Sequence, residues 1–237
     1  MDFKTTVDDC DIEVSLINRN VLVFVPGIPG HANSREIVAA HKAILDDSIA
    51  STFRYTSRRD LEAFEEAKAD RNPYGMMMSY TKEGVGDKRI NKTHQDEFRD
   101  LKVAMDFALD ENPSNIYLSG FSFGGGLATL LLDESYAGRI TKVLLTSPQI
   151  YAPDRDGLPC FGGFPDREKF LEVIAGYEGE LLVVHHEDDP VVAAADVAEL
   201  VSRAGTDKKE FRLLEGANHG FGHDVETYAE MHRDFFL

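Results

Sequence analysis

The chain has 237 residues, of which 43% are apolar, and it carries a formal net charge of −17. This length suits one large domain or two small ones, and the apolar fraction is sufficient for a substantial core. We expect a single domain spanning residues 1–237. The strong negative charge disfavours nucleic acids and anionic membranes as partners.

The sequence shows no sign of a membrane span or of an export signal. No segment reaches about 18 consecutive apolar residues, and residues 1–11 become acidic without an apolar signal region. Cys10 and Cys160 have neither a metal-binding nor a redox spacing, so we expect two reduced thiols. Together these features favour a cytoplasmic protein.

The first part of the chain predicts alternating strands and helices. Residues 11–17 suggest an early antiparallel strand, and the apolar residues 21–25 suggest a strand that is buried on both faces. Ser34 is a suitable N-cap for a helix over residues 35–45, and residues 52–56 form the next expected strand.

The alternation continues to the end of the chain. In order, the expected elements are a helix that starts near Thr93 and Asp96, a strand over residues 115–119, a helix with Leu127, Leu130 and Leu131, strands over residues 142–146 and 180–185, a helix over residues 193–203, a strand over residues 210–214, and a closing helix whose inner face holds Val225, Tyr228, Ala229, His232 and Phe235. Such an order predicts an α/β fold with a mostly parallel sheet covered by helices on both faces.

Residues 120–124 have the pattern of a serine in a sharp turn between a strand and a helix. Ser122 is flanked two residues away by Gly120 and Gly124, whose missing Cβ atoms give a strained turn the room it needs. The helix that follows adds partial positive charge at its N-terminus, where an acyl oxygen would develop negative charge. The sequence therefore predicts Ser122 as a nucleophile.

A serine nucleophile needs a base, and the base needs a group that fixes its tautomer. Asp188 and Asp189 follow the predicted strand over residues 180–185, and His219 follows the strand over residues 210–214. The carboxyl ends of parallel strands meet at one edge of a sheet, so we expect these groups to approach Ser122.

Four motifs together resemble those of the α/β-hydrolase superfamily, in particular its serine esterases and small prolyl-oligopeptidase-like hydrolases. They are Pro26-Gly27-Ile28-Pro29-Gly30, the turn at Ser122, Asp189-Pro190-Val191-Val192 and Asn218-His219-Gly220-Phe221. The resemblance covers residues 21–236 and implies a twisted sheet of about seven to eight strands with a small cap made by loops. It also implies that Ser122, Asp189 and His219 act in the chain order of this family.

The resemblance further implies an oxyanion hole and helps to choose between the two aspartates. The backbone amides of Phe123 and Ile28 would bind the oxyanion, although Pro26 stands where the family often has histidine. In the family a valine commonly follows the acid three residues later, which Asp189 satisfies. Asp188 is the alternative, one residue out of register.

The sequence disfavours metal chemistry and nucleotide-cofactor chemistry. Residues 185–189 contain two histidines and three acids, which are common metal ligands, but neighbouring strand residues point to opposite faces and no spaced histidine pair completes the set. No G-x-G-x-x-G motif follows a strand, which disfavours a nucleotide cofactor. We expect neither a metal nor another cofactor.

Two segments are candidates for the walls of a substrate pocket. Residues 57–92 replace a usually short turn and contain Met and aromatic side chains that either cap the serine or merely pack this excursion onto the body. Residues 149–166 form a second candidate wall.

We expect hydrolysis of small to medium carboxylic esters, with a small-molecule substrate and neither nucleic acid nor membrane as a partner. The same residues also permit a thioesterase or a small peptidase, and the fold permits a binding protein without catalysis.

Overall fold

The computed structural model describes residues 1–8, 10–27, 32, 34–57, 94–133, 136, 138–151, 154–155, 158–159 and 165–237. The predicted residues Ile28 and Cys160, and nearly all of the proposed cap at residues 57–92, lie outside the described part. Most of the second candidate wall lies outside it as well.

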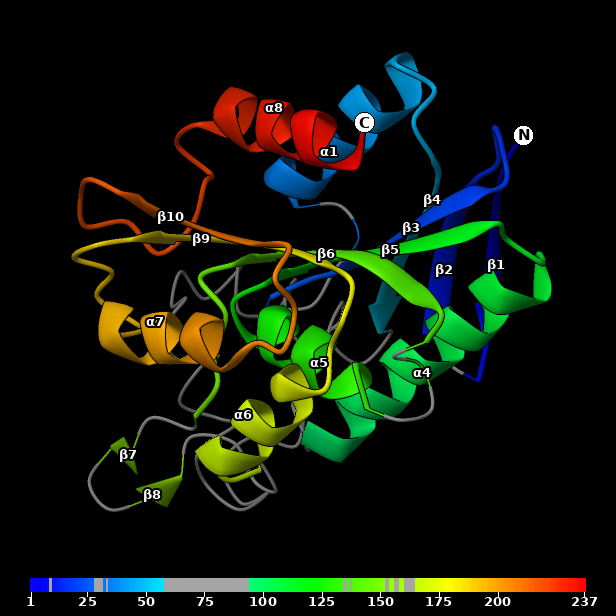
Figure 1. The fold of residues 1–237 in the computed structure, drawn as a ribbon. Coiled ribbons are helices and arrows are strands. Elements are labelled where there is room, and N and C mark those ends of the chain that lie inside the picture. Colours follow the sequence, from blue (N-terminus) through cyan, green and yellow to red (C-terminus); the bar gives the residue numbers. More distant parts are fainter. Residues whose placement is uncertain are drawn as a thin grey trace, which may run out of the picture.

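An eight-stranded sheet forms the centre of the molecule (Figure 1). Its strands, in spatial order, are β1 (Asp2–Val7), β2 (Cys10–Ser15), β4 (Ser51–Ser57), β3 (Asn20–Val25), β5 (Asn115–Phe121), β6 (Ile140–Thr146), β9 (Glu180–His186) and β10 (Lys209–Leu214). Strand β2 pairs antiparallel with both of its neighbours, and every other pairing in this sheet is parallel. The predicted mostly parallel sheet, with an early antiparallel strand, is confirmed.

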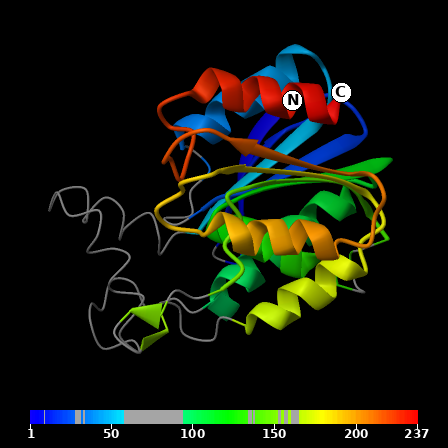
Figure 2. The same ribbon diagram turned by 60° about the vertical axis from the view of Figure 1, so that its left-hand side comes forward.

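Helices cover both faces of the sheet, as Figures 1 and 2 show from two directions. The helices α1 (Arg35–Asp46) and α8 (Val225–Phe236) lie together on one face, and α4 (His94–Asp110), α5 (Phe123–Leu131), α6 (Arg167–Ala175) and α7 (Ala194–Arg203) lie on the other. A separate pair of very short strands, β7 (Asp154–Arg155) and β8 (Leu158–Pro159), lies outside the main sheet.

Strand β3 shows why the centre of the sheet is apolar on both sides. Val21, Val23 and Val25 pack with α4 and α5 in one core, whereas Leu22 and Phe24 pack with α1 and α8 in the other. Successive side chains of a strand point to opposite faces, so a strand between two helix layers must be continuously apolar. This is the run that predicted a buried strand.

The two margins of the sheet are less protected than its centre. Strand β10 has exposed or half-buried side chains along its whole length, and Leu213 is half exposed. Strand β1 alternates between exposed and half-buried positions.

The structure also bears on the expected lack of a membrane span and on the surroundings of Cys10. Within the described ranges, none of the helices is both long and apolar enough to cross a lipid bilayer. Cys10 is fully buried in the core, where its thiol donates to the carbonyl oxygen of Asp100 in α4 at 3.9 Å.

Candidate active site

Ser122 lies in a strained turn between the end of β5 and the start of α5. Its backbone has φ 53° and ψ −122°, a region that costs a non-glycine residue about 1–3 kcal/mol. Four hydrogen bonds hold this conformation. The Ser122 amide donates to the carbonyl oxygen of Thr146 at 2.9 Å, and the Ser122 carbonyl oxygen accepts from the amides of Gly125 and Gln149, both at 2.9 Å, and of Gly126 at 3.2 Å. The surrounding backbone therefore fixes the hydroxyl at the carboxyl edge of the sheet.

The glycines around Ser122 are required by close backbone contacts. A Cβ atom on Gly120 would lie 2.7 Å from the carbonyl oxygen of Gly124, and one on Gly124 would overlap the carbonyl oxygens of Val25 and Pro26. Real Cβ atoms do not approach backbone this closely, so the turn can form only with glycine at both positions. The backbone contacts thus explain the G-x-S-x-G pattern, because they leave no room for a Cβ atom at either glycine.

His219 reaches Ser122 from the loop that follows β10. Its Nε2 atom lies 2.7 Å from the Ser122 Oγ atom, and its Nδ1 atom lies 2.9 Å from Asp189 Oδ2. A carboxylate can only accept, so Nδ1 carries a hydrogen and the neutral ring presents Nε2 as the acceptor for the serine hydroxyl. The His219 side chain is 22% exposed, which leaves the base within reach of a ligand.

Asp189 is held in a tight turn after β9. Its side chain is fully buried, and its Oδ1 atom accepts hydrogen bonds from the amides of Val191 at 2.8 Å and Val192 at 3.0 Å. Burial by itself would raise the pKa of Asp189, but the hydrogen bond and charge of His219 and the two amides outweigh it, so the pKa lies below its usual value. Asp189 therefore stays ionised beside the imidazole.

The structure brings Ser122, His219 and Asp189 into one hydrogen-bonded chain and leaves Asp188 out of it. Asp188 has an exposed side chain, and its backbone amide donates to the carbonyl oxygen of Gly216 at 3.2 Å. Of the two aspartates that the sequence left open, Asp189 is the one that contacts His219.

Aromatic rings line the described part of the site. The Phe121 ring lies 5.4 Å from the His219 ring, and Gly27 and Gly220 both face Phe121, where a Cβ atom would contact its ring at 2.8 Å and 3.0 Å. Phe123, the first residue of α5, is buried, and its ring meets His94 edge to face. Its amide follows the serine at the helix N-terminus, as an oxyanion donor requires.

His185 and His186, which suggested a metal cluster, point to opposite faces of β9. His185 contacts Asp189, whereas the His186 ring packs against Phe221 with their centroids 5.1 Å apart. Across the described segments, no three His, Cys, Asp or Glu side chains converge as ligands of one ion.

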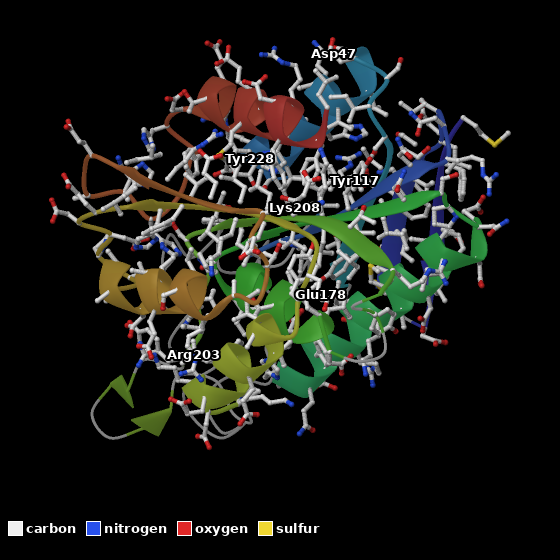
Figure 3. The ribbon with its side chains drawn as sticks, viewed as in Figure 1. Asp47, Tyr117, Glu178, Arg203, Lys208 and Tyr228 are labelled. Carbon is white, nitrogen blue, oxygen red and sulfur yellow. The ribbon has the colours of Figure 1, made fainter. Side chains whose placement is uncertain are left out.

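A second serine–histidine pair lies on the α8 side of the sheet. Ser119 Oγ is 2.7 Å from His232 Nε2, and His232 Nδ1 donates to the Tyr228 carbonyl oxygen at 2.8 Å. Figure 3 shows Tyr228 between α8 and the sheet, and the His232 side chain, like the Tyr228 ring, is buried. Burial lowers the pKa of His232 to about 4. This pair is closed to ligands and joins the closing helix to the sheet.

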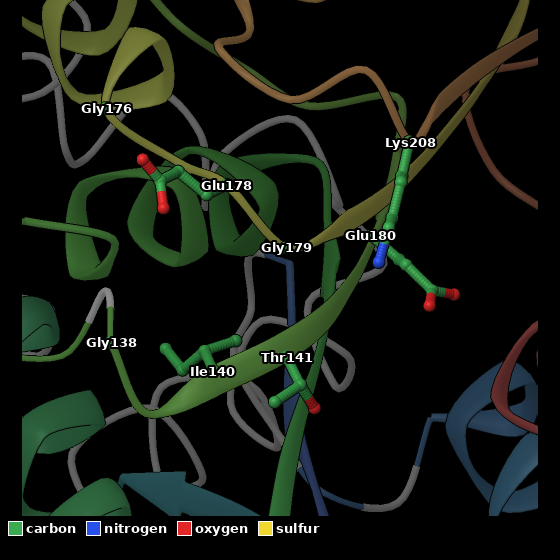
Figure 4. Close-up of a pocket in the computed structure, with 8 residues that line it drawn as sticks. All are labelled: Gly138, Ile140, Thr141, Gly176, Glu178, Gly179, Glu180 and Lys208. Atoms are coloured by element: carbon green, nitrogen blue, oxygen red, sulfur yellow. The ribbon is translucent and has the colours of Figure 1, made fainter.

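A hollow of about 390 Å³ lies at the opposite end of the sheet from Ser122. Figure 4 shows its lining, which includes Ile140 and Thr141 at the start of β6 and the charged residues Glu178, Glu180 and Lys208. Parallel strands place their ligands at the carboxyl edge, whereas these residues lie at the amino edge. The hollow is therefore separate from the serine site.

Sequence reasoning missed three contributors to the site. Thr146 and Gln149 hold the Ser122 backbone, and His185 lies against the Asp189 carboxylate. Backbone groups of Thr146 and Gln149 make the contacts, so their side chains gave no signal. His185 stood in the expected strand and was considered only as a possible metal ligand.

The chain was compared with known proteins by sequence and by structure. No protein-family model matches the chain, and no curated protein matches it significantly in sequence. Solved structures do match. Est1E from Butyrivibrio proteoclasticus is 16% identical over 100% of this chain and 97% of its own, with a TM-score of 0.69. A dienelactone hydrolase from Anabaena variabilis is 13% identical over 100% and 96%, with a TM-score of 0.68. An esterase from Pyrococcus furiosus is 14% identical over 99% and 89%, with a TM-score of 0.67.

The sheet order, the helix layers and these structural matches define the class: the chain has the α/β-hydrolase fold. Identities of this size establish the fold and leave the activity to be argued from the site.

Proposed function

We propose that the protein is a serine hydrolase that cleaves small to medium carboxylic esters through an acyl-enzyme on Ser122, with residues 1–237 acting as one catalytic domain. The observation that carries the proposal is the continuous chain of hydrogen bonds from Ser122 Oγ through His219 to Asp189, with distances of 2.7 Å and 2.9 Å. A hydroxyl, an imidazole and an ionised carboxylate in this order can perform nucleophilic catalysis.

In the first half-reaction, Ser122 Oγ attacks the ester carbonyl carbon while its proton passes to His219 Nε2. The carbonyl oxygen becomes negatively charged, and we assign its stabilisation to the backbone amides of Phe123 and Ile28. His219 then gives the proton to the leaving alkoxide oxygen as the carbon–oxygen bond breaks. Asp189 stabilises the imidazolium between these two steps.

In the second half-reaction, water attacks the acyl-enzyme. His219 Nε2 takes a proton from the water as its oxygen bonds to the acyl carbon, and the proton then returns to Ser122 Oγ when the acid leaves. The products are one carboxylic acid and one alcohol, so the balance needs no cofactor.

An ester is the favoured substrate class because the structural matches include esterases. The Pyrococcus furiosus protein carries that name, and Est1E has been solved with ferulic acid bound. A thioester or a peptide would use the same three residues, so a panel varied separately in acyl and leaving group would rank the three classes.

The deciding experiment compares the wild type with Ser122→Ala on p-nitrophenyl acetate and butyrate. We expect kcat/KM to fall by a factor on the order of 10³ or more in Ser122→Ala. Ser119→Ala is the matched control, because Ser119 also donates to a histidine at 2.7 Å, but its partner His232 is fully buried whereas the His219 side chain is 22% exposed. Equal rates for the wild type and Ser122→Ala would support a binding protein. Chelator-sensitive turnover that survives the substitution would support a metal-dependent hydrolase.

A further inference from the structure

His185 is a buried histidine that contacts the same carboxylate of the proposed catalytic acid as His219 does. It lies near the end of β9, its side chain is fully buried, and its Nδ1 atom is 3.7 Å from Asp189 Oδ2. The mechanism above does not use this residue. Two independent contacts, one at each ring nitrogen, indicate what it does.

The first contact fixes the protonation of the ring. His185 Nε2 lies 3.1 Å from the carbonyl oxygen of Val192, and a carbonyl can only accept, so Nε2 carries the hydrogen. In the neutral ring, Nδ1 then holds a lone pair, and it has no hydrogen-bond partner among the described residues. A lone pair at 3.7 Å does not compete with His219 for the carboxylate.

The same contact holds the turn that positions the acid. Val192 is fixed at both ends of its backbone: its carbonyl oxygen accepts from His185, and its amide donates to Asp189 Oδ1 at 3.0 Å. Movement of this residue would release one of the two amides that orient the carboxylate. His185 is thus linked to Asp189 through the backbone as well as across space.

The charges around His185 favour the neutral ring. Burial lowers the pKa of His185 more than the neighbouring Asp189 carboxylate raises it, and the other titratable groups facing the ring, His219 and His186, act in the lowering direction. A protonated ring would instead place a second donor beside Asp189 Oδ2 and draw the carboxylate away from His219.

We propose that His185 is a positioning residue for Asp189, holding the turn 189–192 through Nε2 while its bare Nδ1 leaves Oδ2 to His219. This assignment rests on the proposed function, because His185 is assigned to support Asp189 as the catalytic acid. It predicts that the two nitrogens of His185 have separable effects, which amide side chains can distinguish.

Three variants separate these effects. His185→Gln places an amide donor near the Nε2 position and can still bond the Val192 carbonyl. His185→Asn places an amide near the Nδ1 position, where it can donate to Asp189 Oδ2 but cannot reach Val192. His185→Leu removes both polar groups at similar size.

We expect kcat for p-nitrophenyl butyrate to fall about 10-fold to 100-fold in His185→Leu and at least as far in His185→Asn, with little change in KM. His185→Gln is expected to recover most of this loss. Equal losses in the Gln and Asn variants, or a change confined to KM, would overturn the proposal. If circular dichroism shows that His185→Leu does not fold, the comparison of the Gln and Asn variants still tests the proposal.

A second readout does not depend on turnover. In the Ser122→Ala background, the proton between His219 Nδ1 and Asp189 is observed by its downfield ¹H resonance. We expect this resonance to weaken or shift in the Leu and Asn variants and to be restored in the Gln variant. An unchanged resonance in all three would overturn the role of His185, whereas absent ester turnover by the wild type would contradict the proposed function alone.

Discussion

The Ser122 amide donates a hydrogen bond of 2.9 Å to the carbonyl oxygen of Thr146, which ties the strained serine to the neighbouring strand β6. Phe121 and Thr146 are register partners in this parallel pair, so the turn begins where the ladder ends. The position of the serine hydroxyl is therefore set by the sheet and depends on the close backbone contacts that surround the turn.

Enlarging Gly124 is expected to break this arrangement. In Gly124→Ala the new Cβ atom overlaps the carbonyl oxygens of Val25 and Pro26, so the backbone of β3 or α5 must move. Overpacking of this kind costs about 1–3 kcal/mol, and urea unfolding would measure the loss. We expect ester turnover to fall together with stability.

Gly138→Ala is the matched control for this substitution. A Cβ atom at Gly138 meets nothing within 4 Å, so we expect stability to change by less than about 0.5 kcal/mol and turnover to stay constant. Comparable losses in the two alanine variants would show that the contacts around Gly124 are not the cause.

Neutralising the buried acid separates the two aspartates. Asp189→Asn removes the charge that stabilises the imidazolium and can hold His219 in the wrong tautomer, so we expect kcat to fall by as much as about 10⁴-fold. Asp188→Asn is expected to stay within about twofold of the wild type, because its side chain is exposed. Steady-state kinetics on p-nitrophenyl butyrate measures both, and a larger loss at position 188 would reverse the assignment.

Acid is expected to destabilise the fold through its buried histidines. Burial lowers the pKa of His232 from 6.5 to about 4, so below about pH 6.5 the unfolded chain binds a proton that the folded chain refuses. The neutral His232 therefore contributes roughly 3 kcal/mol to the free energy of unfolding. This contribution is fully present above pH 6.5 and is lost as the pH falls to about 4. Burial lowers the pKa of His41 and His94 to about 4 as well, in the same direction.

Urea unfolding between pH 4 and pH 7 tests this linkage. The free energy of unfolding of His232→Gln is expected to depend less steeply on pH than that of the wild type. Parallel slopes for the wild type and His232→Gln would contradict it.

The buried hydroxyl of Tyr228 supports the closing helix rather than the chemistry. It hydrogen-bonds Thr146 and Ser119, so Tyr228→Phe leaves buried hydroxyls with one partner fewer. We expect a loss of about 1–2 kcal/mol in unfolding free energy with kcat within twofold of the wild type. A tenfold fall in kcat at unchanged stability would instead connect this network to Ser122.

The helices and strands were predictable where the apolar residues follow one clear pattern. Continuous apolar runs such as residues 21–25 predicted the central strands, and the sheet with two helix layers is confirmed. Strand β1 and helix α6 were not predicted. The first has no fully buried face, and the second is a nine-residue helix whose buried residues, Phe170, Leu171, Val173 and Ile174, form a short cluster.

The sequence predicted those residues of the site that come directly after a predicted strand. The structure brings Ser122, Asp189 and His219 together, while their catalytic roles, and those of Phe123 and Ile28, stay predictions. The contact of His185 with Asp189 could not be foreseen, because it depends on how the turn 189–192 folds back on β9. The pairing of Ser119 with His232 likewise joins residues 113 positions apart.

The sparse cover of β10 has a consequence for how the protein would fail under stress. His219 is attached just beyond this marginal strand, whereas Ser122 is attached to the middle of the sheet. Fraying at the periphery would withdraw the imidazole while most helices stay intact. In rising urea, ester cleavage would then disappear before the helical circular dichroism signal, so the working range would be narrower than the range of folding.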